Sequence, residues 1–137
     1  MEKAKVFYNS ETVKCVNCGK DLFKDTSLSM VQFVTNNKDM ITRVVPCCKG
    51  ECDKRLRRLL NRDEIDGWRD FGDFINPYIF LKHIMSVMNC MYEDKGFENK
   101  EAFENYKNLV IRCYPYVSRN MTEKEIESAR IDEMIPF

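Results

Sequence analysis

Two short cysteine-containing stretches hold the residues of this 137-residue chain that are best suited to chemistry. Cys15 and Cys18 form a C-x-x-C motif that is followed at once by a glycine, and Cys47, Cys48 and Cys52 form a second cluster. Two thiolates in a tight C-x-x-C turn can bind one metal ion, and Zn²⁺ takes four such ligands in tetrahedral geometry. The sequence therefore predicts a zinc site assembled from both stretches.

The spacing of the second cluster favours two of its three cysteines as ligands. Cys48 and Cys52 flank Gly50, and a predicted helix begins at about Glu51, so both thiols would lie near a helix N-terminus that lowers their pKa. We predict Zn²⁺ ligands at Cys15, Cys18, Cys48 and Cys52, with Cys47 as the alternative to Cys48. Four protein ligands leave no position for water, so the predicted ion is structural. Unrelated free thiols and a disulfide or redox pair are the alternatives to a metal site.

The order of these features, a knuckle, a hairpin and a cysteine pair at a helix start, is the treble-clef arrangement. The stretch "CCKGECDKRLRRLL" resembles the TRASH, MYM and FCS group of treble-clef zinc fingers, over residues 12–61. The resemblance implies Cys15 and Cys18 as the first ligand pair and Cys48 and Cys52 as the second, with Cys47 where the family has an aromatic residue. Because that family includes metal-sensing, protein-binding and nucleic-acid-binding members, the resemblance implies a scaffold and not one task.

The elements that must position the cysteines can also be predicted. Apolar, β-branched arms at 29–35 and 40–46 around "NNKD" predict a β-hairpin, and leucines at helical spacing predict a short helix at 51–61. We predict a zinc-binding treble-clef module at 1–61 and an aromatic connector at 62–74.

The C-terminal half has the periodicity of helices and predicts a three-helix bundle at 75–137. The first helix opens at Asn76 and Pro77 and runs to about Lys95. The second covers 99–113 and ends before a proline, and the third covers 123–134, with Thr122 and Glu125 as a capping box. The predicted fold class is α+β, with the N-terminal zinc module followed by this bundle.

Other residues that could carry chemistry are expected to be structural. We expect the connector aromatics to pack the two modules together; they are Trp68, Phe71, Phe74 and Tyr78. We expect His83 not to be a ligand, and Cys90 and Cys113 to be buried thiols. The methionines of the first helix, Met85, Met88 and Met91, are expected in the core.

Charge divides the chain into a basic half and an acidic half. Residues 1–62 carry 13 Lys and Arg against 7 Asp and Glu, and the remaining residues carry 9 against 15, so net charges of +6 and −6 cancel. We expect the halves to attract each other. The basic residues at 53–62 could instead contact nucleic acid or an acidic partner; they are Lys54, Arg55, Arg57, Arg58 and Arg62.

These features favour a binding protein over an enzyme. The chain has no apolar start and no apolar run long enough for a membrane span, and its seven cysteines suit a reducing compartment, so a cytoplasmic location is expected. It also lacks the common catalytic motifs. We predict a small, non-catalytic, zinc-stabilised protein-interaction module, adaptor-like or inhibitor-like, of the kind found in phages or mobile elements. A nucleic-acid-binding regulator using 53–62 is the second hypothesis, and a metal sensor the third.

Overall fold

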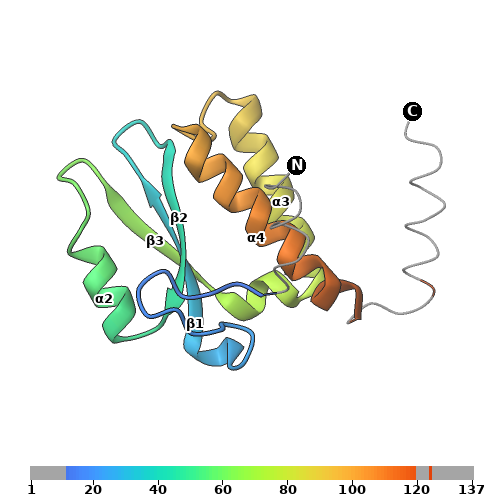
Figure 1. Cartoon of the computed structure of the whole chain (residues 1–137). Helices are drawn as coiled ribbons and strands as arrows, with labels where there is room; N and C mark the ends of the chain where they lie inside the picture. Colours follow the sequence, from blue (N-terminus) through green and yellow to red (C-terminus); the bar gives the residue numbers. More distant parts are fainter. Residues whose placement is uncertain (1–11, 120–123, 125–137) are drawn as a thin grey trace, which may run out of the picture.

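The computed structural model describes residues 12–119 and residue 124, and within them the chain has the predicted α+β class (Figure 1). Three strands form one antiparallel sheet in the order β2-β1-β3. The strands are β1 (Ser29–Thr35), β2 (Ile41–Cys48) and β3 (Ile65–Asp70), and the α-helices are α2 (Glu51–Arg57), α3 (Pro77–Tyr92) and α4 (Lys100–Arg119). Two short 3-10 helices, η1 (Thr26–Leu28) and η2 (Phe71–Ile75), flank the sheet strands.

The predicted hairpin is confirmed. Strand β1 pairs with β2 in a register that places Ser29 opposite Cys48. The side-chain oxygen of Asn36 accepts hydrogen bonds from the backbone N–H groups of Lys38 and Met40, at 2.9 and 3.1 Å, and so closes the turn. The register brings the end of β2, with its two cysteines, to the start of β1.

The middle of the predicted connector at 62–74 forms the third strand of the sheet. Residues 65–70 pair antiparallel with β1, which makes β1 the central strand. The sequence "IDGWRD" gives little sign of a strand because most of its side chains are exposed at the sheet edge. A strand of this kind lacks the apolar alternation on which prediction depends.

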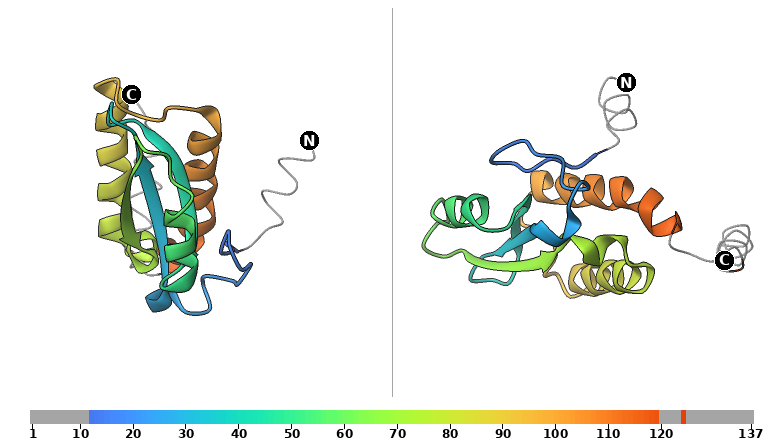
Figure 2. Two further views of the ribbon diagram at one scale, coloured as in Figure 1. Left: turned by 90° about the vertical axis from the view of Figure 1, so that its left-hand side faces the viewer. Right: turned by 90° about the horizontal axis from the view of Figure 1, so that it is seen from below.

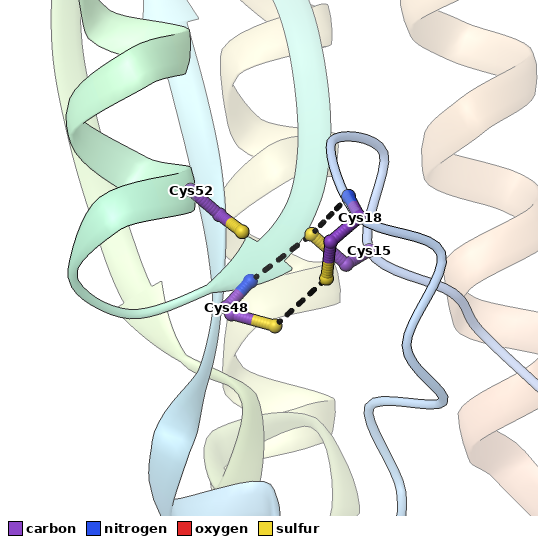
Figure 3. A group of neighbouring side chains, drawn as sticks. All are labelled: Cys15, Cys18, Cys48 and Cys52. Atoms are coloured by element: carbon purple, nitrogen blue, oxygen red, sulfur yellow. Dashed lines mark hydrogen bonds between the residues drawn. The ribbon is translucent and has the colours of Figure 1, made fainter.

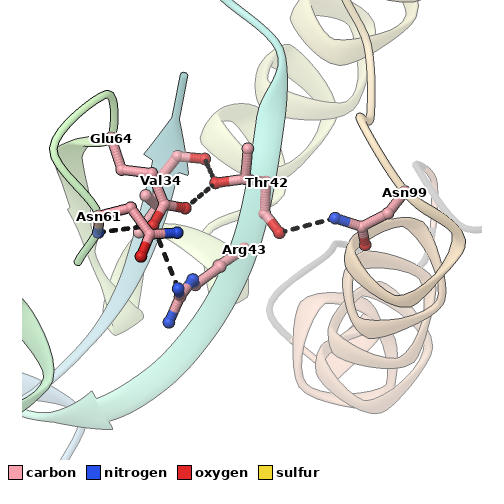
Figure 4. A network of polar contacts seen from close by, with 6 residues as sticks. All are labelled: Val34, Thr42, Arg43, Asn61, Glu64 and Asn99. Atoms are coloured by element: carbon pink, nitrogen blue, oxygen red, sulfur yellow. Dashed lines mark hydrogen bonds and ion pairs between the residues drawn. The ribbon is translucent and has the colours of Figure 1, made fainter. Parts of the chain in front are cut away.

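A buried carboxylate holds the segment before β3 against the hairpin (Figure 4). Glu64 accepts hydrogen bonds from the Thr42 hydroxyl at 2.6 Å, the Arg43 guanidinium at 3.1 Å and the backbone N–H of Asn61 at 2.9 Å. Burial by itself raises the pKa of Glu64, but these bonds and the charge of Arg43 outweigh it and lower the pKa. Asn99 donates to the backbone carbonyl of Thr42 at 3.1 Å, which ties the start of α4 to the same strand.

Helices α3 and α4 pack on one face of the sheet, and α2 lies on the other side (Figure 2). One hydrophobic cluster includes side chains from the N-terminal knuckle, the sheet and both long helices; among its members are Cys15, Val31, Val44, Phe74, Leu109 and Cys113. Within the described residues, α3 and α4 therefore share their core with the sheet.

The helix boundaries differ from the predictions at their C-terminal ends. Asn76 caps α3 as predicted, accepting from the backbone N–H groups of Tyr78 and Ile79. Helix α4 continues through Pro115 to Arg119, although proline removes one helical hydrogen bond. The extra turn places Tyr116 in a stacked contact with Phe23, with ring centroids 4.0 Å apart. The predicted helix at 123–134, with its capping box, lies outside the described residues apart from residue 124.

The aromatic residues predicted to join two modules divide into two groups. Phe71 and Phe74 are buried in the core, as expected. Trp68 and Tyr78 are exposed and do not serve that purpose. The methionines of α3 are also exposed, so their assignment to the core is wrong. No helix in the described part of the chain is long and apolar enough to cross a membrane.

His83 is enclosed by aromatic rings. Its Nδ1 atom lies 2.8 Å from the Tyr106 hydroxyl, and its ring is 4.9 Å from that of Phe33 and 5.1 Å from that of Phe74. Burial, with a smaller contribution from the positive charge of Arg69, lowers the pKa of His83 to about 4. The imidazole is therefore neutral near pH 7, where it packs among these rings.

We expect the pKa of His83 to make the fold sensitive to acid. An unfolded chain would bind a proton near pH 6.5, whereas the folded chain does so only near pH 4. This contribution to stability is therefore present above pH 6.5 and lost as the pH falls toward 4, and it amounts to on the order of 3 kcal/mol. Urea unfolding of the wild type and of His83→Gln across this range should show a shallower pH dependence for the variant. If the free energy of unfolding depends on pH equally in the two proteins, His83 is not the source of the acid sensitivity.

Candidate metal centre

The first cysteine pair is held in a tight knuckle. An isolated bridge between Lys14 and Asp21 closes its base. The backbone N–H of Gly19 donates to the carbonyl of Cys15 at 2.9 Å, and the N–H of Cys15 donates to Lys20 at 2.8 Å. Gly19 has a φ of 80°, in the left-handed region where glycine alone is unstrained. The knuckle therefore depends on the glycine that follows Cys18, as the sequence suggested.

The second pair spans the junction of β2 and α2. Cys48 is the last residue of β2 and Cys52 lies in the first turn of α2. Between them Gly50 has a φ of 95°, which lets the chain turn sharply from strand to helix. This turn points both thiols toward the knuckle.

The four sulfurs of Cys15, Cys18, Cys48 and Cys52 converge at one point (Figure 3). All of them lie within 4.8 Å of one another, and those of Cys18 and Cys48 are 3.7 Å apart. A tetrahedral Zn²⁺ with Zn–S bonds of about 2.3 Å requires sulfurs about 3.8 Å apart. The donor set and its spacing thus fit a metal ion with little rearrangement.

Cys47 lies apart from this group. Successive side chains of a strand point to opposite faces, and the Cys47 side chain is wholly buried in the core while Cys48 joins the cluster. Burial, and to a lesser degree the negative charge of Asp53, raises the pKa of Cys47 to about 12. The alternative in which Cys47 replaces Cys48 is therefore not the arrangement in this structure.

The remaining two cysteines are not members of this group. Cys113 is buried in α4, where burial raises the pKa of its thiol to about 12, and Cys90 is half-buried in α3. All seven cysteines lie in the described residues, and none forms a disulfide.

Backbone N–H groups stabilise the negatively charged form of the Cys15 sulfur. The N–H groups of Cys18 and Cys48 both lie 3.4 Å from the Cys15 sulfur. Burial raises the pKa of Cys15, but these hydrogen bonds and one from Asn17 outweigh it and lower the pKa to about 7. Amide groups aimed at a sulfur are the expected environment of a metal-bound thiolate.

Cys48 and Cys52, by contrast, have raised pKa values. Burial and the neighbouring thiols of Cys18 and Cys15 raise the pKa of Cys48 to about 12. The Asn17 amide, 3.2 Å from the Cys52 sulfur, lowers the pKa of Cys52, yet burial and the other thiols raise it overall. A divalent cation bound by these sulfurs would favour the thiolate form of each ligand. Asn17 was not predicted from the sequence, and its place between Cys15 and Cys18 is the only signal for it.

The basic residues of α2 divide between internal ion pairs and solvent. Arg57 lies 3.3 Å from Asp53 and 3.9 Å from Asp66, and Lys54 lies 4.0 Å from Glu51. Arg55, Arg58 and Arg62 are exposed, and no ion pair to them is found among the described residues.

Among the described residues, three ion pairs connect the basic half to the acidic half, as expected from the charge distribution. They are Arg43 with Glu64, Lys49 with Asp70 and Arg57 with Asp66. All three acidic partners lie in or beside β3, so part of the charge asymmetry serves to hold this strand.

A second feature is an apolar groove of about 230 Å³ between α3 and α4. Exposed Met88, Met91 and Ile111 lie at its rim, and Phe103 and Val110 lie deeper. Lys107 is the one charged lining residue in the described part of the chain, and its Nζ atom is 4.9 Å from the centre of the Phe103 ring. This groove was not predicted from the sequence, because the methionines of α3 were expected in the core.

Comparisons of this chain with known protein families, with curated proteins and with solved structures found no match.

Proposed function

We propose that this protein is a non-catalytic protein-interaction module whose fold is stabilised by one Zn²⁺ ion in a treble-clef site. The convergence of four cysteine sulfurs supports the zinc, because four thiolates complete the coordination of a tetrahedral ion. The order of knuckle, hairpin and helix supports the treble-clef assignment. A complete ligand set has no position for substrate or water, which argues for a structural ion.

The observation that carries the interaction function is the apolar groove between α3 and α4. Its volume of about 230 Å³ is below the roughly 300–1,000 Å³ of typical small-molecule sites. It would suit a single apolar side chain, such as leucine or phenylalanine, on a partner protein. Exposed methionines at the rim can adapt to such a side chain, since their thioethers are flexible and polarizable. We propose a protein partner that anchors one apolar residue in this groove.

A charge at the rim of the groove is expected to abolish partner binding. Ile111→Glu would place a carboxylate where the anchoring side chain must bury itself, at a cost of at least about 2 kcal/mol, or 30-fold in affinity. The partner is first recovered by pull-down from the native host. Titrating it against each variant then measures the change in affinity. Leu59→Glu, at an exposed apolar position just after α2, is the matched control and should bind normally. Equal binding by Ile111→Glu and the wild type would exclude the groove.

A nucleic-acid-binding regulator is a second candidate, favoured by the exposed arginines of α2. Arg55, Arg58 and Arg62 project from or just beyond one short helix without an ion pair among the described residues, so they are available to phosphates.

This second candidate predicts binding to random DNA or RNA that weakens steeply with salt. Each phosphate neutralised contributes a slope of about −0.9 to the logarithm of affinity against that of salt for duplex DNA. The double variant Arg55→Gln, Arg58→Gln should reduce the slope by roughly 2. A matched variant at Lys100, an exposed cation of α4, should leave it unchanged. No binding at low salt would remove this candidate.

A further inference from the structure

The outward face of α3 carries a row of apolar side chains with no partner in the described chain. Tyr78, Leu81, Met85, Met88 and Tyr92 are 72, 58, 54, 61 and 92% exposed. We call these five residues the α3 stripe. They follow one another at intervals of three, four, three and four, which is the a/d spacing of a helix that packs along another helix. Single exposed apolar residues are common, but a continuous stripe marks an interface.

The α3 stripe lies along a groove whose lining carries little charge. A shallow groove of about 310 Å³ runs along it, lined by Tyr78, Leu81, Met85 and three polar neighbours, Lys82, Ser86 and Asn89. Lys82 is the only charged residue between Pro77 and Tyr92, and its Nζ atom is 6.0 Å from the ring of Tyr78. A helix laid into this groove would therefore meet apolar surface with one cation beside it.

We propose that the α3 stripe packs against the α3 stripe of a second copy of this chain, with the two helices antiparallel about a two-fold axis. A two-fold interface uses the same patch twice, so the patch must be self-complementary. The α3 stripe is self-complementary, because its a/d spacing is the same in both copies and its face bears a single charge. The resulting dimer shares only Met88 with the rim of the partner-binding groove, and it extends the proposed function without depending on it.

Charge selects the antiparallel arrangement. In a parallel pair the two Lys82 side chains would lie side by side, and the acidic residues that follow α3, Glu93 and Asp94, would also meet their own copies. When Met85 faces Met88 of the second copy in the antiparallel pair, Lys82 falls opposite the neutral Met91. The acidic residues then lie beside the first turn of the other α3, where the helix dipole is positive.

Sedimentation equilibrium of the zinc-loaded full chain over a range of concentrations tests this proposal. The wild type should be a dimer, and Met85→Glu should weaken dimerisation by about 100-fold or more, because the carboxylate would be buried without a partner. Met85 is more than half exposed in the single chain, so the variant should keep its circular dichroism and melting temperature. Leu59→Glu is the control for an equal change elsewhere and should remain dimeric.

Mixing Met85→Glu with Met85→Lys should restore a dimer, because opposite charges then meet at the axis. This rescue shows direct contact and not misfolding. A wild type that is monomeric at every concentration would overturn the proposal, and so would a dimer that Met85→Glu leaves unchanged. A monomer that still binds a partner in an Ile111-dependent way would refute the dimer and leave the proposed function standing.

Discussion

Replacing Cys15 with serine is expected to abolish tight zinc binding and to unfold the protein. The Cys15 sulfur is the most buried of the four and accepts the amide hydrogen bonds of the site. Structural zinc contributes about 10–16 kcal/mol in small zinc-finger peptides. That is as large as the roughly 5–15 kcal/mol net stability of a whole domain. Metal content by mass spectrometry and the circular dichroism melting curve together measure the effect.

The matched control for Cys15→Ser is Cys90→Ser, which alters a thiol outside the cluster and should keep one zinc per chain. Cys47→Ala should also keep the metal, with a loss of stability from the core. A Cys15→Ser protein that binds one zinc and melts like the wild type would contradict the site. If a chelator removes zinc rapidly and reversibly while the fold persists, the metal-sensor hypothesis gains over a structural role.

Replacing Phe71 with alanine is expected to cost about 3–5 kcal/mol of folding free energy. Its side chain is wholly buried in η2, and its ring packs edge-to-face on Phe23 with centroids 5.0 Å apart. Because η2 contacts the end of the sheet and both long helices, the cavity would lie where all layers meet. Urea unfolding of the variant and the wild type, with zinc held in excess, measures the difference in unfolding free energy without interference from metal loss.

Trp68→Ala is the comparison for Phe71→Ala. Trp68 is a larger aromatic residue three positions earlier, but more than half of its surface is exposed, so its removal should cost less than about 1 kcal/mol. Similar losses for the two variants would show that the core is not where the structure places it.

The candidate site could be predicted from the sequence because its determinants are local. A C-x-x-C motif followed by Gly19, and a cysteine pair around Gly50 at a helix start, specify turns that need no distant residue. The hairpin between the pairs was predictable for the same reason, since Asn36 closes its turn from within. Local chemistry therefore indicated four of the seven cysteines, and the alternation of side chains along β2 explains why Cys48 joins the cluster and Cys47 the core.

The position of the C-terminal half could not be predicted because it depends on contacts between distant segments. Helix α3 carries apolar residues around most of its circumference, so the sequence does not indicate which side meets the sheet. Phe80 and Val87 face inward, while Met85 and Met88 face out. Strand β3 is likewise defined by its pairing with β1 and by the bonds of Glu64, and not by its own composition.

The placement of all four sulfurs between residues 15 and 52 bears on how the chain is made. Ribosomes deliver the N-terminal segments first, so a nascent chain could bind the proposed zinc ion before the segments that form α3 and α4 have been synthesised. Until those helices arrive, the sheet face that they cover, with Val31 and Phe33, stays open to water and to chaperones. Early metal capture would hold the hairpin in register during that interval, so zinc starvation should harm newly made protein more than protein already folded.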